Sequence, residues 1–331
     1  MRFPRAAKHF CLAWQVLACG IIIVRQGSAL RQAEYTSVSA QKQKQKAEKT
    51  ASGTRVKFTT IGKQMTPVVE VLLNENVPAR FLVDTGSPSC YISPAVAQKL
   101  GLPLQQAPES TGDNKGLPGK GSMVAIPKVH LGDVVLDPLY VRVWPEKGWS
   151  PAKEGLDGIL GAPLFNICPV AIDFVRHEMD VLEPGSKTDT YVDGFKGGRA
   201  SILDVELRGG YFFVKARFDD LVEESMMVDT GSAITIISKR LAKQLRVQAD
   251  PLEYRARTFY GVRSCFYANV HKLTIGGETV YNAQVAILDP EIKQLPQILG
   301  LDVLADHYLF FDVPSRKLYI MRTGPAGLLK H

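Results

Sequence analysis

An internal duplication constrains this chain more than any other feature of its sequence. The segment Phe81–Ser87, FLVDTGS, recurs as Met226–Ser232, MMVDTGS. Three further pairs of blocks follow in the same order: Val129–Asp133 with Leu273–Gly277, Ile159–Leu164 with Ile298–Val303, and Ile172–Phe174 with Phe311–Val313. Ordered self-similarity of this kind indicates two copies of one structural unit. We therefore expect related domains at residues 58–185 and 201–331, joined by an exposed linker at 186–200.

Each copy has the pattern of short strands separated by turns. The β-rich runs Val68–Leu73 and Phe212–Phe218 are each followed by a polar turn and a return strand that ends on an Asp. Helical signals are short, and the main ones are Pro94–Leu100 and its counterpart Lys239–Leu245. The pattern predicts an all-β fold of two lobes with short helices.

The first 57 residues differ in character from the rest of the chain. A basic start, an apolar stretch from Phe10 to Val24 and small residues near Ala29 are typical of a signal peptide at residues 1–29. An uncleaved signal anchor and lipidation at Cys19 are the alternatives. Residues 30–57 are polar and rich in Lys and Gln, which predicts a flexible tether. The protein is therefore expected to be exported, to the periplasm, the cell exterior or an extracytoplasmic membrane face.

The net charge of +7 does not favour nucleic acid as a partner. Most of the excess lies in the first 57 residues, so the two repeats together are close to neutral. No apolar run reaches the ~20 residues of a membrane-spanning helix, so no membrane contact is expected beyond an N-terminal anchor. The His residues have no metal-type spacing, and neither a metal nor a cofactor is expected. Cys90, Cys168 and Cys265 allow either a Cys90–Cys168 disulfide or three buried thiols.

The repeated Asp-Thr-Gly-Ser points to chemistry rather than to turn formation alone. The flanking residues of the two copies have diverged, whereas these four residues are identical. Asp84 and Asp229 each end an apolar strand, where a lone carboxylate is costly unless it is hydrogen-bonded or shares a proton. Two related lobes can present one carboxyl each across a pseudo-twofold axis. The pair would retain one proton, and a water between the two groups would meet a base and an acid.

These motifs resemble those of aspartic proteases of the pepsin and retropepsin type, and the short lobes resemble two fused retropepsin-like units. The resemblance implies the two-lobed acid-protease fold, with β-barrel lobes related by a pseudo-twofold axis. It also implies that Asp84 and Asp229 are the catalytic pair. Thr85 and Thr230 would lock the two loops together. Gly86 and Gly231 would allow close passage of the backbone, and Ser87 and Ser232 would hydrogen-bond the outer carboxylate oxygens.

The resemblance also implies a polypeptide substrate and a flap that covers it. The implied substrate is a polypeptide, cleaved by an enzyme that is active as a monomer because both Asp residues belong to one chain. The first-lobe flap region has no aromatic residue, so Gly116, Gly119 and Gly121 are the candidate flap residues, with Tyr260 and Gly261 in the second lobe. Leu160-Gly161 and Leu299-Gly300 would pack behind the active loops. A catalytically silent peptide-binding or assembly module is the alternative function.

Overall fold

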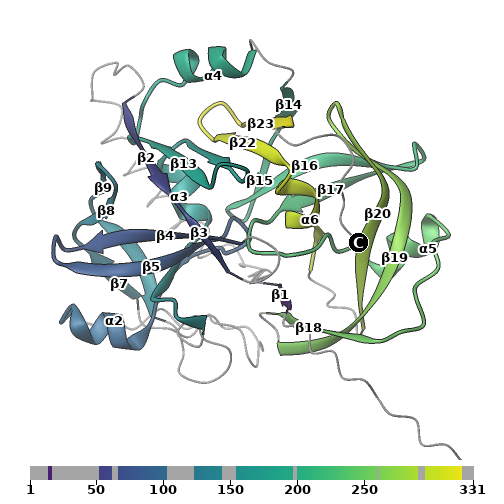
Figure 1. Cartoon of the computed structure of the whole chain (residues 1–331), viewed down its shortest axis with the longest axis horizontal. Coiled ribbons are helices and arrows are strands. Elements are labelled where there is room, and N and C mark those ends of the chain that lie inside the picture. Colours follow the sequence, from purple (N-terminus) through teal and green to yellow (C-terminus); the bar gives the residue numbers. More distant parts are fainter. Residues whose placement is uncertain are drawn as a thin grey trace, which may run out of the picture.

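Two β lobes and a sheet shared between them make up the protein (Figure 1). The structure is a computed structural model that describes residues 14–16, 52–61, 66–102, 123–143, 154–196, 200–258, 261–289 and 295–322. Strands dominate, and the described helices span at most eight residues. The predicted all-β, two-lobed fold is confirmed. No described helix has the length and hydropathy needed to cross a membrane.

The first lobe is built on one sheet with the strand order β7-β10-β6-β11-β5-β4-β8-β9, with β3 paired to β4. Its strands are β3 (Thr59–Ile61), β4 (Thr66–Leu73), β5 (Val77–Val83), β6 (Cys90–Ile92), β7 (Met123–Ile126), β8 (Val129–Leu131), β9 (Val134–Leu136), β10 (Leu139–Val143) and β11 (Gly158–Leu160). Two helices belong to this lobe, α2 (Pro94–Lys99) and α3 (Ala162–Ile167).

The second lobe repeats this plan. Its sheet has the order β1-β18-β19-β16-β17-β21, with β15 paired to β16 and β20 to β19. Its strands are β1 (Trp14–Val16), β15 (Glu206–Arg208), β16 (Tyr211–Phe218), β17 (Val222–Val228), β18 (Tyr254–Thr258), β19 (Gly261–Ile275), β20 (Glu278–Asp289) and β21 (Gln297–Leu299), and its helices are α5 (Lys239–Gln244) and α6 (Leu301–Leu304). Strand β1 lies within the predicted signal segment and pairs parallel to β18.

The duplication is visible in local structure. Helices α2 and α5 begin in the same way, because the hydroxyls of Ser93 and Ser238 cap them by accepting hydrogen bonds from backbone N–H groups three residues later. The strands that lead to the two Asp residues, β5 and β17, each pair in parallel with the strand that precedes the second short helix. Helices α2 and α5 confirm the two short helices predicted from the sequence.

A third sheet joins the two halves. Its strand order is β14-β23-β22-β12-β13-β2, and its strands are β2 (Gly53–Lys57), β12 (Val170–Asp173), β13 (Glu178–Leu182), β14 (Ser201–Asp204), β22 (His307–Asp312) and β23 (Lys317–Arg322). Strand β12 of the first repeat pairs directly with β22 of the second. Because the two groups of strands join in one hydrogen-bonded sheet at the β12–β22 pair, the lobes cannot separate without breaking that pair.

Two expectations about connecting segments are wrong in part. The last residues of the predicted tether form β2, which pairs with β13. The predicted exposed linker contains α4 (Asp189–Lys196), whose Val192 is buried against Phe310 and Tyr319 of the shared sheet. The polar composition of these segments did not indicate either element. A few apolar residues are enough to form a strand or helix when the rest of the chain supplies the surface against which they pack.

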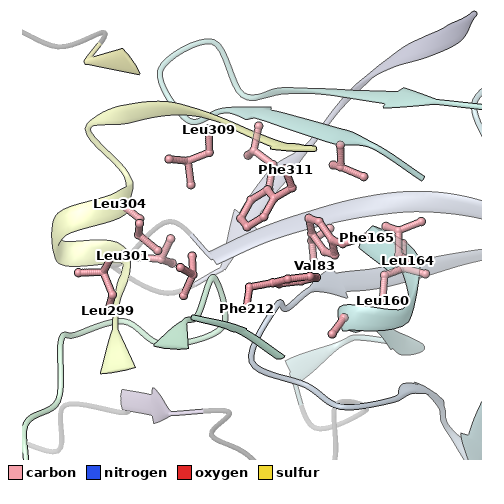
Figure 2. Close-up of a cluster of buried hydrophobic side chains, with 14 of the residues drawn as sticks. Val83, Leu160, Leu164, Phe165, Phe212, Leu299, Leu301, Leu304, Leu309 and Phe311 are labelled. Carbon is pink, nitrogen blue, oxygen red and sulfur yellow. The ribbon is translucent and has the colours of Figure 1, made fainter. Parts of the chain in front are cut away.

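The main hydrophobic core runs through both lobes. Phe165 of α3, Phe212 of β16 and Phe311 of β22 meet at its centre, with ring centroids 4.9–5.9 Å apart (Figure 2). Val83, which directly precedes Asp84, packs into the same core. So does Leu299, which precedes Gly300, the N-cap of helix α6. The described cysteines are buried and free, so no Cys90–Cys168 disulfide forms.

Candidate active site

Asp84 and Asp229 occupy equivalent places in the two lobes. Each follows the last residue of a buried strand, β5 or β17. The N–H of Asp84 donates to the Leu160 carbonyl at 2.9 Å, and the N–H of Asp229 donates to the Leu299 carbonyl at 3.0 Å. Both side chains are fully buried. The supporting strands β11 and β21 therefore set the position of each Asp from behind.

The inner carboxylate oxygens are held by the loop backbone. Asp84 Oδ1 accepts from the N–H of Gly86 at 2.9 Å. Asp229 Oδ1 accepts from the N–H groups of Gly231 and Ser232 at 2.9 and 3.0 Å. The outer oxygens, Oδ2 of both residues, have no hydrogen-bond partner among the described residues other than the carboxyl of the opposite lobe. Each carboxyl is thus fixed in orientation while one oxygen stays available for chemistry.

The two carboxyls meet across the glycines of the two loops. A β-carbon at Gly86 would lie 2.3 Å from Asp229 Cγ, and one at Gly231 would lie 2.4 Å from Asp84 Cγ. Each loop therefore passes against the carboxyl of the other lobe, a distance that only glycine permits. The close passage expected of these glycines is present in the structure.

Burial and mutual repulsion both favour one retained proton. Burial raises the pKa of Asp84 well above its ordinary value, and the nearby charge of Asp229 raises it further. Burial also raises the pKa of Asp229, although hydrogen bonds from Asp84 and from the Gly231 and Ser232 backbone oppose the shift. Because the proton belongs to the pair rather than to either residue, the dyad holds an acid and a base side by side over a wide pH range.

Two threonines bind the loops to each other. Thr85 Oγ1 donates to the Val228 carbonyl at 2.8 Å and accepts from the Thr230 N–H at 3.0 Å. Thr230 Oγ1 donates to the Val83 carbonyl at 2.9 Å and accepts from the Thr85 N–H at 3.0 Å. All four hydrogen bonds are buried and cross between lobes. They hold the two Asp residues in a common frame.

The expectation for the two serine hydroxyls is wrong. Ser87 Oγ donates to the Ser89 carbonyl at 2.9 Å, and Ser232 Oγ donates to the Ile234 carbonyl at 2.8 Å. A hydroxyl has one proton to donate, so these side chains close their own loops and leave the outer oxygens of the Asp pair without a serine contact. Support of the active loop remains their role.

Short helices α3 and α6 pack behind the loops, as expected for the Leu-Gly segments. Ala162 N–H donates to the Ser87 carbonyl and Leu301 N–H to the Ser232 carbonyl, both at 2.8 Å. A β-carbon at Gly161 would lie 2.3 Å from the Ser89 carbonyl oxygen. Glycine is required there because helix and loop touch through their backbones.

The flap residues are only partly within the described structure. Gly116, Gly119, Gly121 and Tyr260 lie outside the described residues. Gly261 is the first residue of β19 and pairs with Thr258 of β18, so the two strands form a hairpin at the candidate second-lobe flap. The covering role of either segment stays a prediction.

Sequence reasoning missed Asp302, which supports the second loop. Asp302 Oδ1 accepts from the N–H and hydroxyl of Thr235 at 2.9 and 2.8 Å. Burial raises its pKa to about 7, against the effect of those hydrogen bonds. The repeat alignment itself contained the signal, because Pro163 stands at the matching position of the first lobe. A charged residue at only one of two duplicated positions marks a difference in function or in packing.

Comparisons with known proteins agree with this geometry. A family model described as "Aspartyl protease" matches residues 69–164, and one described as "gag-polyprotein putative aspartyl protease" matches residues 214–306. An aspartic proteinase from Irpex lacteus is 16% identical, with a TM-score of 0.50, over 82% of this chain and 98% of its own. A retropepsin-like aspartic protease from Rickettsia conorii is 16% identical, with a TM-score of 0.30, over 40% of this chain and 94% of its own. No curated protein matches the chain.

The fold and the paired loops together define the class of two-lobed aspartyl proteases. A segment in each half of the chain matches an aspartyl protease family model, and 82% of the chain has the fold of the Irpex lacteus proteinase. The chain thus consists of two retropepsin-like aspartyl protease domains in tandem.

Proposed function

We propose that the protein is an aspartic endopeptidase in which Asp84 and Asp229 activate one water. One observation carries this proposal: two buried carboxyls, one from each lobe, meet across Gly86 and Gly231 with their inner oxygens bound to the loop backbone and their outer oxygens facing only each other. The meeting of two carboxyls sets this site apart, because a buried oxygen without a partner also occurs at the single carboxyl of Asp312.

The chemistry follows from the single shared proton. The ionised carboxylate accepts a proton from water, whose oxygen attacks the peptide carbonyl carbon. The protonated carboxyl donates its proton to the carbonyl oxygen, which gives a tetrahedral diol. A diol proton then returns to a carboxylate, the other carboxyl protonates the amide nitrogen, and the C–N bond breaks. No covalent bond to the enzyme forms.

Replacement of either Asp tests the assignment. Asp84→Asn and Asp229→Asn each keep the size of the side chain but remove one half of the acid–base pair. We expect kcat for peptide cleavage to fall by at least about 10³-fold in each variant and the double variant to be no worse than the singles, since the pair acts as a unit. Near wild-type cleavage by either variant would contradict the proposal.

Asp312→Asn is the matched control for these variants. Asp312 is also buried and repeated, its counterpart being Asp173, but both stand beyond the supporting helices. Asp173 Oδ1 accepts from the N–H groups of Val175 and Arg176, which is a turn role. Asp312 Oδ2 accepts from Thr188 Oγ1, and an amide oxygen can do the same. We expect this variant to cleave at close to the wild-type rate.

A catalytically silent module on the same scaffold is the competing function. A pepstatin-like mimic of the tetrahedral diol separates the two, because its hydroxyl needs both outer oxygens. Binding that is lost in Asp84→Asn supports the enzyme, whereas equal binding by both forms supports a passive peptide-binding groove.

The proposal extends to assembly and location. Both Asp residues come from one chain, so we expect specific activity to be independent of dilution; loss of activity on dilution would indicate a site formed between chains. We also propose export, on the basis of the signal-like residues 1–29. N-terminal sequencing of the mature protein decides between cleavage, anchoring and lipidation at Cys19.

A further inference from the structure

A row of side chains crosses the first-lobe sheet on the face opposite the main core. Arg142 of β10 is paired with Tyr91 of β6, Tyr91 with Ile159 of β11, and Ile159 with Leu82 of β5. Paired residues in adjacent strands place their side chains on the same face. The alternate residues, such as Val141 and Val83, pack in the main core, whereas Tyr91, Ile159 and Leu82 form a separate small cluster. Arg142 therefore belongs to this row, which continues to Met123 of the edge strand β7, and faces away from the main core.

This face adjoins the active loop. Leu82 is two residues before Asp84, and Arg142 Nε donates to Ser89 Oγ at 3.2 Å. The Ser89 carbonyl in turn accepts from Ser87 of the Asp-Thr-Gly-Ser loop. Burial raises the pKa of the Tyr91 phenol to about 12, an effect that the Arg142 charge opposes and the Asp84 charge reinforces. One phenol thus lies within electrostatic reach of both the guanidinium and the catalytic carboxyl.

The Arg142 guanidinium has unused binding capacity. Arg142 is half-buried, and among the described residues its buried Nη1 has no hydrogen-bond partner and no ion pair joins the guanidinium to a carboxylate. A buried cationic donor without a partner is costly. A carboxylate is the group that matches the guanidinium best, because two parallel N–H donors can bind its two oxygens. The arrangement is poised for an acidic group brought by a ligand.

The duplicated position in the second lobe carries no charge. There Ile236, the counterpart of Tyr91, forms a parallel bridge with Ala286 and an antiparallel bridge with Ile298. Ala286 thus takes the place of Arg142. It packs in an apolar cluster with Phe213, Met227 and Ile298. The two sides of the Asp pair therefore differ in charge, with a guanidinium on the first-lobe side and a buried apolar cluster at the matching place on the second.

We propose that Arg142 is a specificity-determining residue that binds a substrate carboxylate on the first-lobe side of the scissile bond. This inference rests on the proposed protease function and adds the substrate class, a polypeptide with an acidic group on one side of the cleavage position. Because Ala286 replaces Arg142 in the other lobe, the same charge on the opposite side of the bond gains nothing.

Matched peptides test the proposal in two ways. One series places Glu or Gln, in turn, at each of four positions on either side of the cleaved bond, with both termini blocked. A second series has Gln throughout and a free C-terminal carboxylate at varied distance, so that side-chain and terminal carboxylates are distinguished. kcat/KM is measured on the active protein, and binding is measured by fluorescence anisotropy on the Asp84→Asn, Asp229→Asn double variant, which does not depend on turnover.

We expect the wild type to prefer Glu over Gln by roughly tenfold or more at one position on one side, mainly through KM. Arg142→Met should reduce that preference to within about twofold, Arg142→Lys should keep part of it, and Arg142→Glu should favour Lys at the same position. Arg217→Met, an exposed arginine on β16 of the second lobe, should leave the preference unchanged.

Several results would overturn the inference. One is a wild type that shows no carboxylate preference in either the cleavage or the binding measurement. Another is an Arg142→Met variant that keeps the preference, or that lowers the affinity for all peptides equally. Either result would mean that Arg142 only positions Ser89. Failure of the protease function has a different signature, because peptides would then bind with Glu selectivity but not be cleaved.

Discussion

At the scale of single residues, the active loops depend on the absence of side-chain atoms as much as on the carboxyls. Gly86 and Gly231 leave room for the carboxyl of the opposite lobe, where a β-carbon would come within 2.3–2.4 Å of its atoms. Real contacts are never that short, so a larger residue must push the Asp pair apart. The glycines thereby decide the separation of the two carboxyls, which a search for acid–base residues alone would overlook.

Gly86→Ala should therefore inactivate the protein without unfolding it. We expect kcat/KM to fall by at least about 10²-fold, because displacement of a catalytic group by about 1 Å has effects of that size. Gly185→Ala is the control: Gly185 has a φ of 75° and no atom near the added β-carbon, so it should cost only about 1–2 kcal/mol of stability and no activity. Equal activity losses in both variants would refute this explanation.

At the scale of elements, the two active loops form one unit through Thr85 and Thr230. Thr85→Val removes a donor and an acceptor, and it leaves the Val228 carbonyl and the Thr230 N–H buried without partners. We expect a loss of about 2–5 kcal/mol in urea unfolding. Thr85→Ser should recover most of it, because the hydroxyl remains. If Thr85→Ser were as unstable as Thr85→Val, packing of the methyl group would be responsible instead.

A second element-scale feature anchors the shared sheet. Asp180 of β13 accepts from Arg55 of β2 at 2.6 and 2.9 Å and from the Tyr191 hydroxyl of α4 at 2.6 Å. Burial alone would raise the pKa of Asp180, but these hydrogen bonds lower it below its ordinary value. Its contribution to stability is therefore present above about pH 4 and is lost as the pH falls.

Asp180→Asn should show this contribution directly. We expect the variant to be less stable than the wild type at neutral pH, and the difference should shrink as the pH falls below about 4. Hydrogen exchange of the β2 and α4 amides should rise more than that of β4 and β5. A uniform rise across the chain would instead mean that the shared sheet and the lobes unfold as one unit.

At the scale of the whole molecule, carboxyls whose pKa is raised by burial make the protein less stable as the pH rises, which is opposite to the effect of Asp180. The folded-state pKa values of Asp84, Asp229 and Asp302 are raised by burial. Such groups favour the folded state fully below about pH 4, where the unfolded chain is also protonated, and lose that contribution as the pH rises through the folded-state pKa, which is about 7 for Asp229 and for Asp302. Stability should thus be highest in mildly acidic solution.

Asp302→Asn isolates one of these groups. The amide oxygen can still accept both hydrogen bonds from Thr235 but has no charge to bury. We expect the variant to gain stability relative to the wild type as the pH rises from 4 to 8, by up to about 4 kcal/mol. Thermal unfolding across this range, with exposed Asp204→Asn as control, checks it; parallel curves for Asp302→Asn and the wild type would contradict the shift.

The sequence by itself determined the features that depend on local pattern. The duplicated Asp-Thr-Gly-Ser predicted two related lobes, the apolar residues before each Asp predicted buried strands, and short helices were correctly expected at Pro94 and Lys239. These elements follow from neighbouring residues, because strand and helix periodicity and capping act over a few positions.

Only the tertiary structure decided how distant segments share their interactions. Strand β2 and helix α4 lie in polar segments, yet β2 joins, and α4 packs on, a sheet whose strands come from both repeats. The serine hydroxyls bind loop carbonyls rather than the Asp pair, and Arg142 reaches Ser89 from a strand some fifty residues away. Each of these outcomes depends on a contact between residues far apart in the chain, and local pattern cannot encode which of many chemically suitable partners the completed fold brings within hydrogen-bonding distance.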